Sequence, residues 1–268
     1  MKSISKLVKN EFVKLFSEKK FYVILAYIII LTLIVGNNYT NNRYDLTSSS
    51  EYFPPHMKFL LKNINAINFL KLFSTDSIFT GTTPFLIIII SFLAIDTFLY
   101  DYKSGNAKFT LAAGISKFEL TLSKYIYMAI TIFTIVCMLF IFGFFIGAIF
   151  FGTKNITLSD ILNTFVIYLI GCLPLLAFTS IVAVISTTNI SKSILTLLSI
   201  SISILISICD TFSKSKYFSP IGMLGLFNTD APMSINYSIL YCGLISFIYL
   251  LATFIIYFII IEQKDIFV

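Results

Sequence analysis

The sequence contains few of the side chains that catalysis, metal binding or nucleotide binding require. Histidine occurs once, at His56, and the four cysteines are isolated, without a CxxC pair or a Cys/His cluster. The phosphate-binding pattern GxxxxGK[ST] and the zinc pattern HExxH are both absent. These absences speak against an enzyme, a metal or redox site, and nucleotide binding through a P-loop. We therefore expect no cofactor and no catalytic residue in this chain.

Charged residues are also scarce, and long apolar runs take their place. Only 12% of the residues are charged, whereas soluble domains carry roughly 25%, and the mean hydropathy is +0.93. A helix that crosses a bilayer needs ~20 mostly apolar residues. We predict an all-α integral membrane protein, forming one transmembrane domain over residues 1–268. Its six predicted spans are 21–36, 84–100, 125–150, 161–187, 193–210 and 237–261.

The basic residues predict how the chain is oriented in the membrane. The formal net charge is +6, with 18 lysines beside a single arginine. If the N-terminus is inside, the inner segments hold most of the basic residues. These are Lys2, Lys6, Lys9, Lys14, Lys19, Lys20, Lys103, Lys108, Lys117, Lys124, Lys192 and Lys264. Basic residues concentrate on the cytoplasmic side of membrane proteins. We predict a multi-pass cell-membrane protein with both termini cytoplasmic, and we attribute the charge to orientation and not to nucleic-acid binding.

Residues 1–20 have the pattern of an amphipathic helix. Ile4, Leu7, Phe12 and Leu15 recur at helical spacing, and most of the lysines lie on the other side. Such a helix lies in the headgroup layer, with its apolar face toward lipid and its lysines toward anionic headgroups. The pattern leaves two roles open: a simple lipid anchor, or a lever that couples a partner to the first span.

The segment 101–124 is a long polar stretch between two apolar spans. Gly105 and Gly114 divide it, and the residues between them, including Phe109, predict one short helix. Residues 189–192 alone join the fourth and fifth spans, so this inner loop is unusually long. Long structured loops among tight turns are typical of functional segments.

Two outer loops also carry structural signals. In residues 37–80, the apolar residues after Met57 follow a helical period and predict a second surface helix. Residues 211–236 combine Pro220 and Pro232 with glycines and apolar residues, which predicts a re-entrant stretch that could gate an outer exit. Irregular backbone at membrane depth requires cover from protein or water.

Small and polar residues within the spans have several interpretations. Gly143 and Gly147 form a small-xxx-small pattern that predicts close helix packing. The hydroxyl stripe of the fifth span favours either packing or a substrate-facing or subunit-facing surface, and it consists of Thr196, Ser199, Ser203 and Ser207. Asp96 is the ionisable residue inside a span, so it is either a coupling acid or the partner of a nearby lysine.

The polar segment carries a resemblance to a known family. Asp101, Gly105, Asn106, the run Ile115-Ser116-Lys117 and Lys124 resemble the loop between spans two and three in the membrane subunits of type-2 ATP-binding-cassette exporters. These are bacterial drug, antibiotic-resistance and lantibiotic-immunity permeases. Asn106 and Ile115 depart from the family pattern, which has threonine and proline there. The motif covers only this loop, whereas the architecture agrees over the whole chain.

The resemblance implies a permease that works as a homodimer or with a similar second permease. A separate ATPase subunit would dock on residues 104–117 and 2–19 and would carry out all ATP hydrolysis. The coupling residues implied are Asp101, Lys103, Gly105, Asn106, Lys108, Phe109, Gly114, Ser116 and Lys117. Spans two and five would line the path, and the cargo would be amphipathic or hydrophobic, such as an antimicrobial peptide, a drug or a lipid. The alternative is a secondary transporter or channel that acts without an ATPase.

Overall fold

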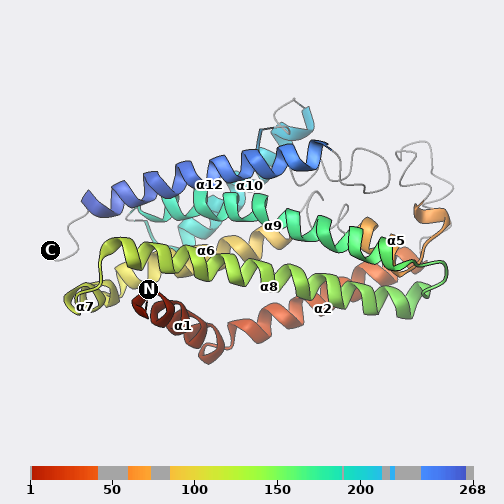
Figure 1. Cartoon of the computed structure of the whole chain (residues 1–268), viewed down its shortest axis with the longest axis horizontal. Helices are drawn as coiled ribbons and strands as arrows, with labels where there is room; N and C mark the ends of the chain where they lie inside the picture. The colour runs from red at the N-terminus through yellow and green to blue at the C-terminus, as the bar shows by residue number, and fades with distance from the viewer. Residues whose placement is uncertain are drawn as a thin grey trace.

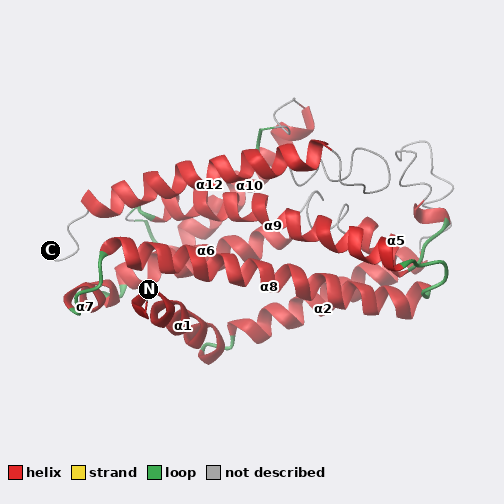
Figure 2. Ribbon diagram, in the orientation of Figure 1, coloured by secondary structure: helices red, strands yellow, loops and turns green. Residues whose placement is uncertain are grey.

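All regular secondary structure in the described residues is α-helical (Figure 2). The computed structural model describes residues 2–41, 60–73, 85–188, 190–212, 218–220 and 237–263. The helices are α1 (Lys2–Ser17), α2 (Lys20–Asn41), α5 (Ala66–Phe73), α6 (Phe85–Lys103), α7 (Asn106–Ala112), α8 (Lys117–Phe151), α9 (Leu158–Ser186), α10 (Lys192–Phe212) and α12 (Tyr237–Gln263). The all-α prediction is thus confirmed for these residues.

The long helices run along the longest axis of the molecule (Figure 1). The start of α1, the short helix α7 and the end of α12 lie at one end, here named the α7 end. The helix α5 and the connection between α8 and α9 lie at the opposite end. The helix α9 packs against α12, α8 and α6, and α8 packs against α1, α2 and α5. The core therefore lies around α6, α8 and α9.

Four helices in the described residues are long and apolar enough to cross a membrane. They are Lys20–Asn41, Lys117–Phe151, Leu158–Ser186 and the segment Tyr241–Gln263 of α12. The remaining apolar segment of α10, Lys192–Ile206, is shorter. Many large apolar side chains on these helices face outward, which suits a surrounding of lipid. These four helices indicate a membrane-embedded protein.

Some helices extend further than the apolar runs predicted. The helix α2 continues to Asn41, beyond the predicted span end at residue 36, and α8 begins at Lys117, inside the predicted loop 101–124. Ser116 caps α8: its hydroxyl accepts from the Glu119 backbone N–H, and the Glu119 carboxylate accepts from the Ser116 N–H. This capping box extends the helix into polar sequence. The predicted re-entrant stretch in residues 211–236 lies almost entirely outside the described residues.

The surface helix predicted in residues 37–80 is wrong for the part that the structure describes. The helix α5 is inside the bundle, where Ala66, Phe69 and Leu70 are fully buried. The hydroxyl of Tyr168 donates a hydrogen bond of 2.9 Å to the Leu70 carbonyl, which anchors α5 to α9. Apolar residues cover most of the short helix and not one stripe of it, so burial on several sides is favourable.

The two glycines of α8 make room for this buried helix. A Cβ at Gly143 would lie 2.6 Å from Leu70 Cδ2, and one at Gly147 would lie 2.8 Å from Phe69 Cδ1. Both distances are shorter than real Cβ contacts, so a side chain at either glycine would force a shift in the α5 side chain beside it, and the two glycines let α5 pack closely on α8. The packing role predicted for the small-xxx-small pattern is confirmed.

Candidate functional site

The helix α7 stands between two backbone turns that require glycine. Gly105 precedes it with φ +77° and Gly114 follows it with φ +84°, both in the left-handed region. Ala107 is buried against Leu120 of α8, and Tyr102 and Leu111 pack around this contact. The short helix predicted between the two glycines is confirmed, and it is fixed to the start of α8.

The outward side of α7 is exposed and mixed in character. Phe109 is 77% exposed, and the side chains of Asn106 and Lys108 are also exposed. Lys103, just before α7, donates a hydrogen bond to the Ile190 carbonyl near the start of α10. We name Asn106, Lys108 and Phe109 the α7 surface.

Lys117 joins the region after α7 to the last helix. Its ammonium group donates hydrogen bonds of 3.2 Å to the Ile261 carbonyl and 2.9 Å to the Glu262 carbonyl. These carbonyls belong to the final turn of α12, where backbone acceptors lack helical partners. In the same first turn of α8, Glu119 accepts a hydrogen bond from the Ser3 hydroxyl of α1. The first turn of α8, which follows α7, is thus joined to both α1 and α12.

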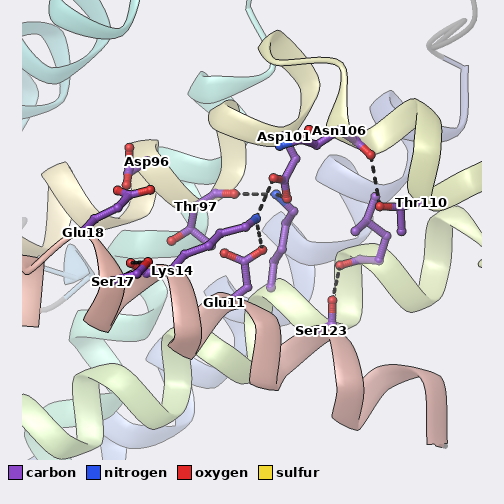
Figure 3. Close-up of polar contacts among 12 residues, drawn as sticks. Glu11, Lys14, Ser17, Glu18, Asp96, Thr97, Asp101, Asn106, Thr110 and Ser123 are labelled. Atoms are coloured by element: carbon purple, nitrogen blue, oxygen red, sulfur yellow. Dashed lines mark hydrogen bonds and ion pairs between the residues drawn. The ribbon is translucent and has the colours of Figure 1, made fainter.

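A cluster of charged side chains lies behind α7, where α1, α6 and α8 meet (Figure 3). Asp101 of α6 is its centre: Lys14 Nζ lies 2.8 Å from Oδ1 and Lys124 Nζ lies 2.8 Å from Oδ2. Lys14 also contacts Glu11 at 3.0 Å, and Lys124 donates to the Thr97 carbonyl. The Lys124 side chain is 0% exposed. We name Glu11, Lys14, Asp101 and Lys124 the Asp101 cluster.

Burial affects the ionisation of the two α1 members of this cluster. Burial raises the pKa of Glu11, and the charges of Lys124 and Lys14 offset this only in part. Burial lowers the pKa of Lys14, but the hydrogen bond to Asp101 and the charges of Glu11 and Asp101 outweigh it, so this pKa lies above its ordinary value. Lys14 therefore stays positively charged and holds α1 against α6 at neutral pH.

A second cluster surrounds Asp96, five residues earlier on α6. Its carboxylate contacts Lys20 at the start of α2 and Lys192 at the start of α10. Lys20 also contacts Glu18. The pairing of Asp96 with a lysine is confirmed. Together, the two acids of α6 bind lysines from α1, α2, α8 and α10.

Comparison with known protein families places the chain in one of them. The family described as "Protein of unknown function (DUF2705)" matches residues 27–267. The chain belongs to this family. No curated protein matches the chain. The family region contains α7, both acids of α6, Lys124 and Lys192, whereas α1 and Lys20 precede it.

Within the family region, the predicted coupling residues have two kinds of surroundings. Asp101 is buried in its cluster, whereas Asn106, Lys108, Phe109 and Ser116 are exposed at the α7 end. The sequence did not identify Lys14, Lys20 and Lys192 as the partners of the α6 acids. The available signal was their position, because Lys20 and Lys192 are each the first residue of a helix.

Two hydroxyls of the stripe on α10, which is also in the family region, are buried. Ser199 is 1% exposed and Ser203 is 0% exposed. Thr196, Ser199 and Ser203 donate to carbonyls of their own helix at 2.6, 3.0 and 2.7 Å. The packing interpretation accounts for these bonds, and a role in a path or dimer interface stays a prediction. The side chain of Ser207 lies outside the described residues.

Proposed function

We propose that this chain is the permease subunit of an ATP-driven exporter and that a separate ATP-binding-cassette ATPase docks on the α7 surface. The observation that carries this proposal is α7 itself. It presents Phe109 to water beside Asn106 and Lys108, while Ala107 fixes the helix to α8. Aromatic anchors with a polar surround are typical centres of protein interfaces.

The charge clusters supply a route from this surface into the bundle. The helix α7 follows α6 after a two-residue turn, so a force on α7 acts directly on α6. Asp101 passes this force to α1 and α8, and Asp96 passes it to α2 and α10. Ion pairs that can re-form in a second arrangement are a common element of switching transitions.

The proposal includes six spans, with α6 and α10 added to the four apolar helices. The helix α6 has 19 residues and is about 28 Å long, close to the ~30 Å hydrocarbon core. Both termini would be cytoplasmic, at the side of the α7 surface. A second permease copy or a similar paralogue would complete the path. The pairing of the α6 acids leaves the outward faces apolar, which favours an amphipathic or hydrophobic cargo such as an antimicrobial peptide, a drug or a lipid.

The test is a pull-down of the tagged chain from its native host in mild detergent, followed by an ATPase assay on the eluate. We expect a stoichiometric nucleotide-binding subunit with the unmodified chain. Phe109→Ala should lower its recovery about tenfold or more, because loss of an interface anchor typically costs ~2 kcal/mol or more. Phe145→Ala, an equally drastic change of an exposed ring on α8, should retain the subunit.

A chain that elutes alone and without ATPase activity would contradict the exporter proposal. The alternative is a secondary transporter with Asp96 as its coupling acid. That role requires Asp96 to exchange protons, whereas its carboxylate is bound by Lys20 and Lys192. Transport that needs no ATPase and stops in Asp96→Asn would favour the alternative.

A further inference from the structure

A groove of about 440 Å³ lies between α2 and α6. Its walls are apolar: Ile24 and Tyr27 line it from α2, and Ile89, Phe92 and Leu93 line it from α6. Sites for small molecules typically have volumes of ~300–1,000 Å³. The groove shares Glu18 and Lys20 with the Asp96 cluster, and none of its lining residues belongs to the α7 surface.

One end of the groove is charged. Glu18 and Lys20 line this end, and Lys20 contacts Asp96. The ammonium group of Lys192 contacts Asp96 and lies 5.0 Å from the centre of the Phe92 ring. Lys19, next to Lys20, is exposed. The charges of Glu18, Lys20, Asp96 and Lys192 balance one another in these ion pairs, and the exposed Lys19 adds one positive charge beside the mouth.

The groove is shorter than the hydrocarbon part of one leaflet, which is ~15 Å thick. Along α2 it extends from Lys20 to Tyr27, and seven helical residues rise about 10 Å. The hydrocarbon core is ~30 Å thick, so the groove remains within one leaflet. The charged residues Glu18 and Lys20 lie where α1 leads into α2, in the half of the molecule that contains α7 (Figure 1). Because an amphipathic helix such as α1 lies in the headgroup layer, we expect this mouth at the level of the headgroups. An apolar groove with a positive charge beside one end matches the amphipathic structure of a single anionic phospholipid.

We propose that this groove binds an acyl chain of an anionic phospholipid from the leaflet at the α7 end. The phosphate lies at the mouth beside the exposed Lys19, and the acyl chain lies against Ile24, Ile89 and Phe92. One lysine near the membrane surface favours anionic lipid by about 1 kcal/mol, which is about fivefold in association. The lipid site does not require an ATPase partner, so its test is independent of the test of the exporter proposal.

The absence of tryptophan in this chain allows a direct test. Phe92→Trp places a single fluorophore in the groove, and Phe133→Trp places one on the outward face of α8. These two phenylalanines are 44% and 50% exposed. The full chain is reconstituted into bilayer discs that contain brominated phosphatidylglycerol or brominated phosphatidylcholine. Bromine quenches tryptophan on contact, so the two lipids can be compared at each site.

We expect the phosphatidylglycerol-to-phosphatidylcholine association ratio to be about fivefold at Phe92→Trp and about one at Phe133→Trp. Adding Lys19→Asn should bring the groove ratio toward one, since asparagine keeps the left-handed backbone of Lys19 (φ 56°) and removes the charge. Val23→Trp, on the α2 wall, provides a second probe if Phe92→Trp misfolds.

Equal ratios at the groove and at the α8 face would overturn the proposal. Absence of quenching in the groove by either lipid would also overturn it, because a second copy of the chain or another protein would then cover the groove.

Discussion

At the scale of single residues, Lys124 has the most demanding surroundings. A fully buried lysine is rare in proteins unless an acid neutralises it. Here Asp101 lies 2.8 Å away and the Thr97 carbonyl accepts a further bond, so the ammonium group is both paired and hydrogen-bonded. The charge links α8 to α6 directly behind the α7 surface. Lys124 is therefore a buried structural residue that links α8 to α6, and not an exposed docking residue.

Replacement of Lys124 should destabilise the fold strongly. Lys124→Ala leaves Asp101 buried with Lys14 as its remaining lysine, and breaking a buried pair typically costs ~3–5 kcal/mol. We expect a clear fall in the Tm of the detergent-solubilised chain. Lys9→Ala, on the exposed side of α1, should leave the Tm nearly unchanged.

The double variant Lys124→Met with Asp101→Leu refines this experiment. It removes both buried charges and leaves the Lys14–Glu11 pair, so it should recover part of the lost stability. A Tm for Lys124→Ala equal to that of Lys9→Ala would show that the Asp101 cluster contributes little.

The contacts of Asp96 could be predicted from the sequence only in part. The pairing of Asp96 with a lysine could be predicted, because an isolated acid inside a span requires neutralisation. The identity of its partners could not, since Lys20 and Lys192 are far apart in the sequence and meet Asp96 only after α2, α6 and α10 pack. Apolar periodicity carries no information about such contacts.

At the scale of elements, the contact between α5 and α8 depends on two missing side chains. A Cβ at Gly147 would lie 3.1 Å from the backbone Cα of Ala66, whereas the nearest atom to a Cβ at Gly143 is the end of the flexible Leu70 side chain. A flexible side chain can move, but the backbone of a buried helix cannot. Gly147 is therefore the stricter of the two positions.

Gly147→Ala should lower stability more than Gly143→Ala. Overpacking typically costs ~1–3 kcal/mol, which exceeds the ~1 kcal/mol that alanine gains over glycine within a helix. Gly243→Ala in α12 is the matched control, because its nearest neighbour would lie at an ordinary 3.5 Å. We expect the order of Tm values Gly243→Ala, Gly143→Ala, Gly147→Ala, from highest to lowest. A Gly147→Ala variant as stable as the control would contradict the close approach of α5.

Element boundaries were predictable only where the signal was local. The short helix α7 followed from Gly105 and Gly114, and the start of α8 was present in the sequence as Ser116 and Glu119, a capping-box spacing. The burial of α5 was not predictable, since an apolar helix near the membrane surface and one inside the bundle have similar sequences. Its position depends on Gly143 and Gly147, which lie about 75 residues away in the chain.

At the scale of the whole molecule, the two ends of the bundle differ in character. The α7 end holds both charge clusters, the exposed Phe109 and the start of α1. The opposite end holds α5 and the turn between α8 and α9. The Ala66 backbone N–H of α5 donates a 3.0 Å hydrogen bond to the Gly152 carbonyl in this turn. Most lysines in the described residues lie in the half of the bundle that contains α7, and the positive-inside rule is therefore the basis for our proposal that this end is cytoplasmic.

Cysteine labelling of intact cells tests this orientation. In a chain whose four cysteines are replaced by alanine, Ser104→Cys lies at the α7 end and Lys154→Cys lies at the opposite end, both at exposed positions. We expect a membrane-impermeant maleimide to label Lys154→Cys in intact cells and Ser104→Cys only after permeabilisation. Labelling of Ser104→Cys from outside would reverse the topology. It would also exclude a cytoplasmic ATPase from the α7 surface, so this measurement decides whether the exporter proposal is geometrically possible.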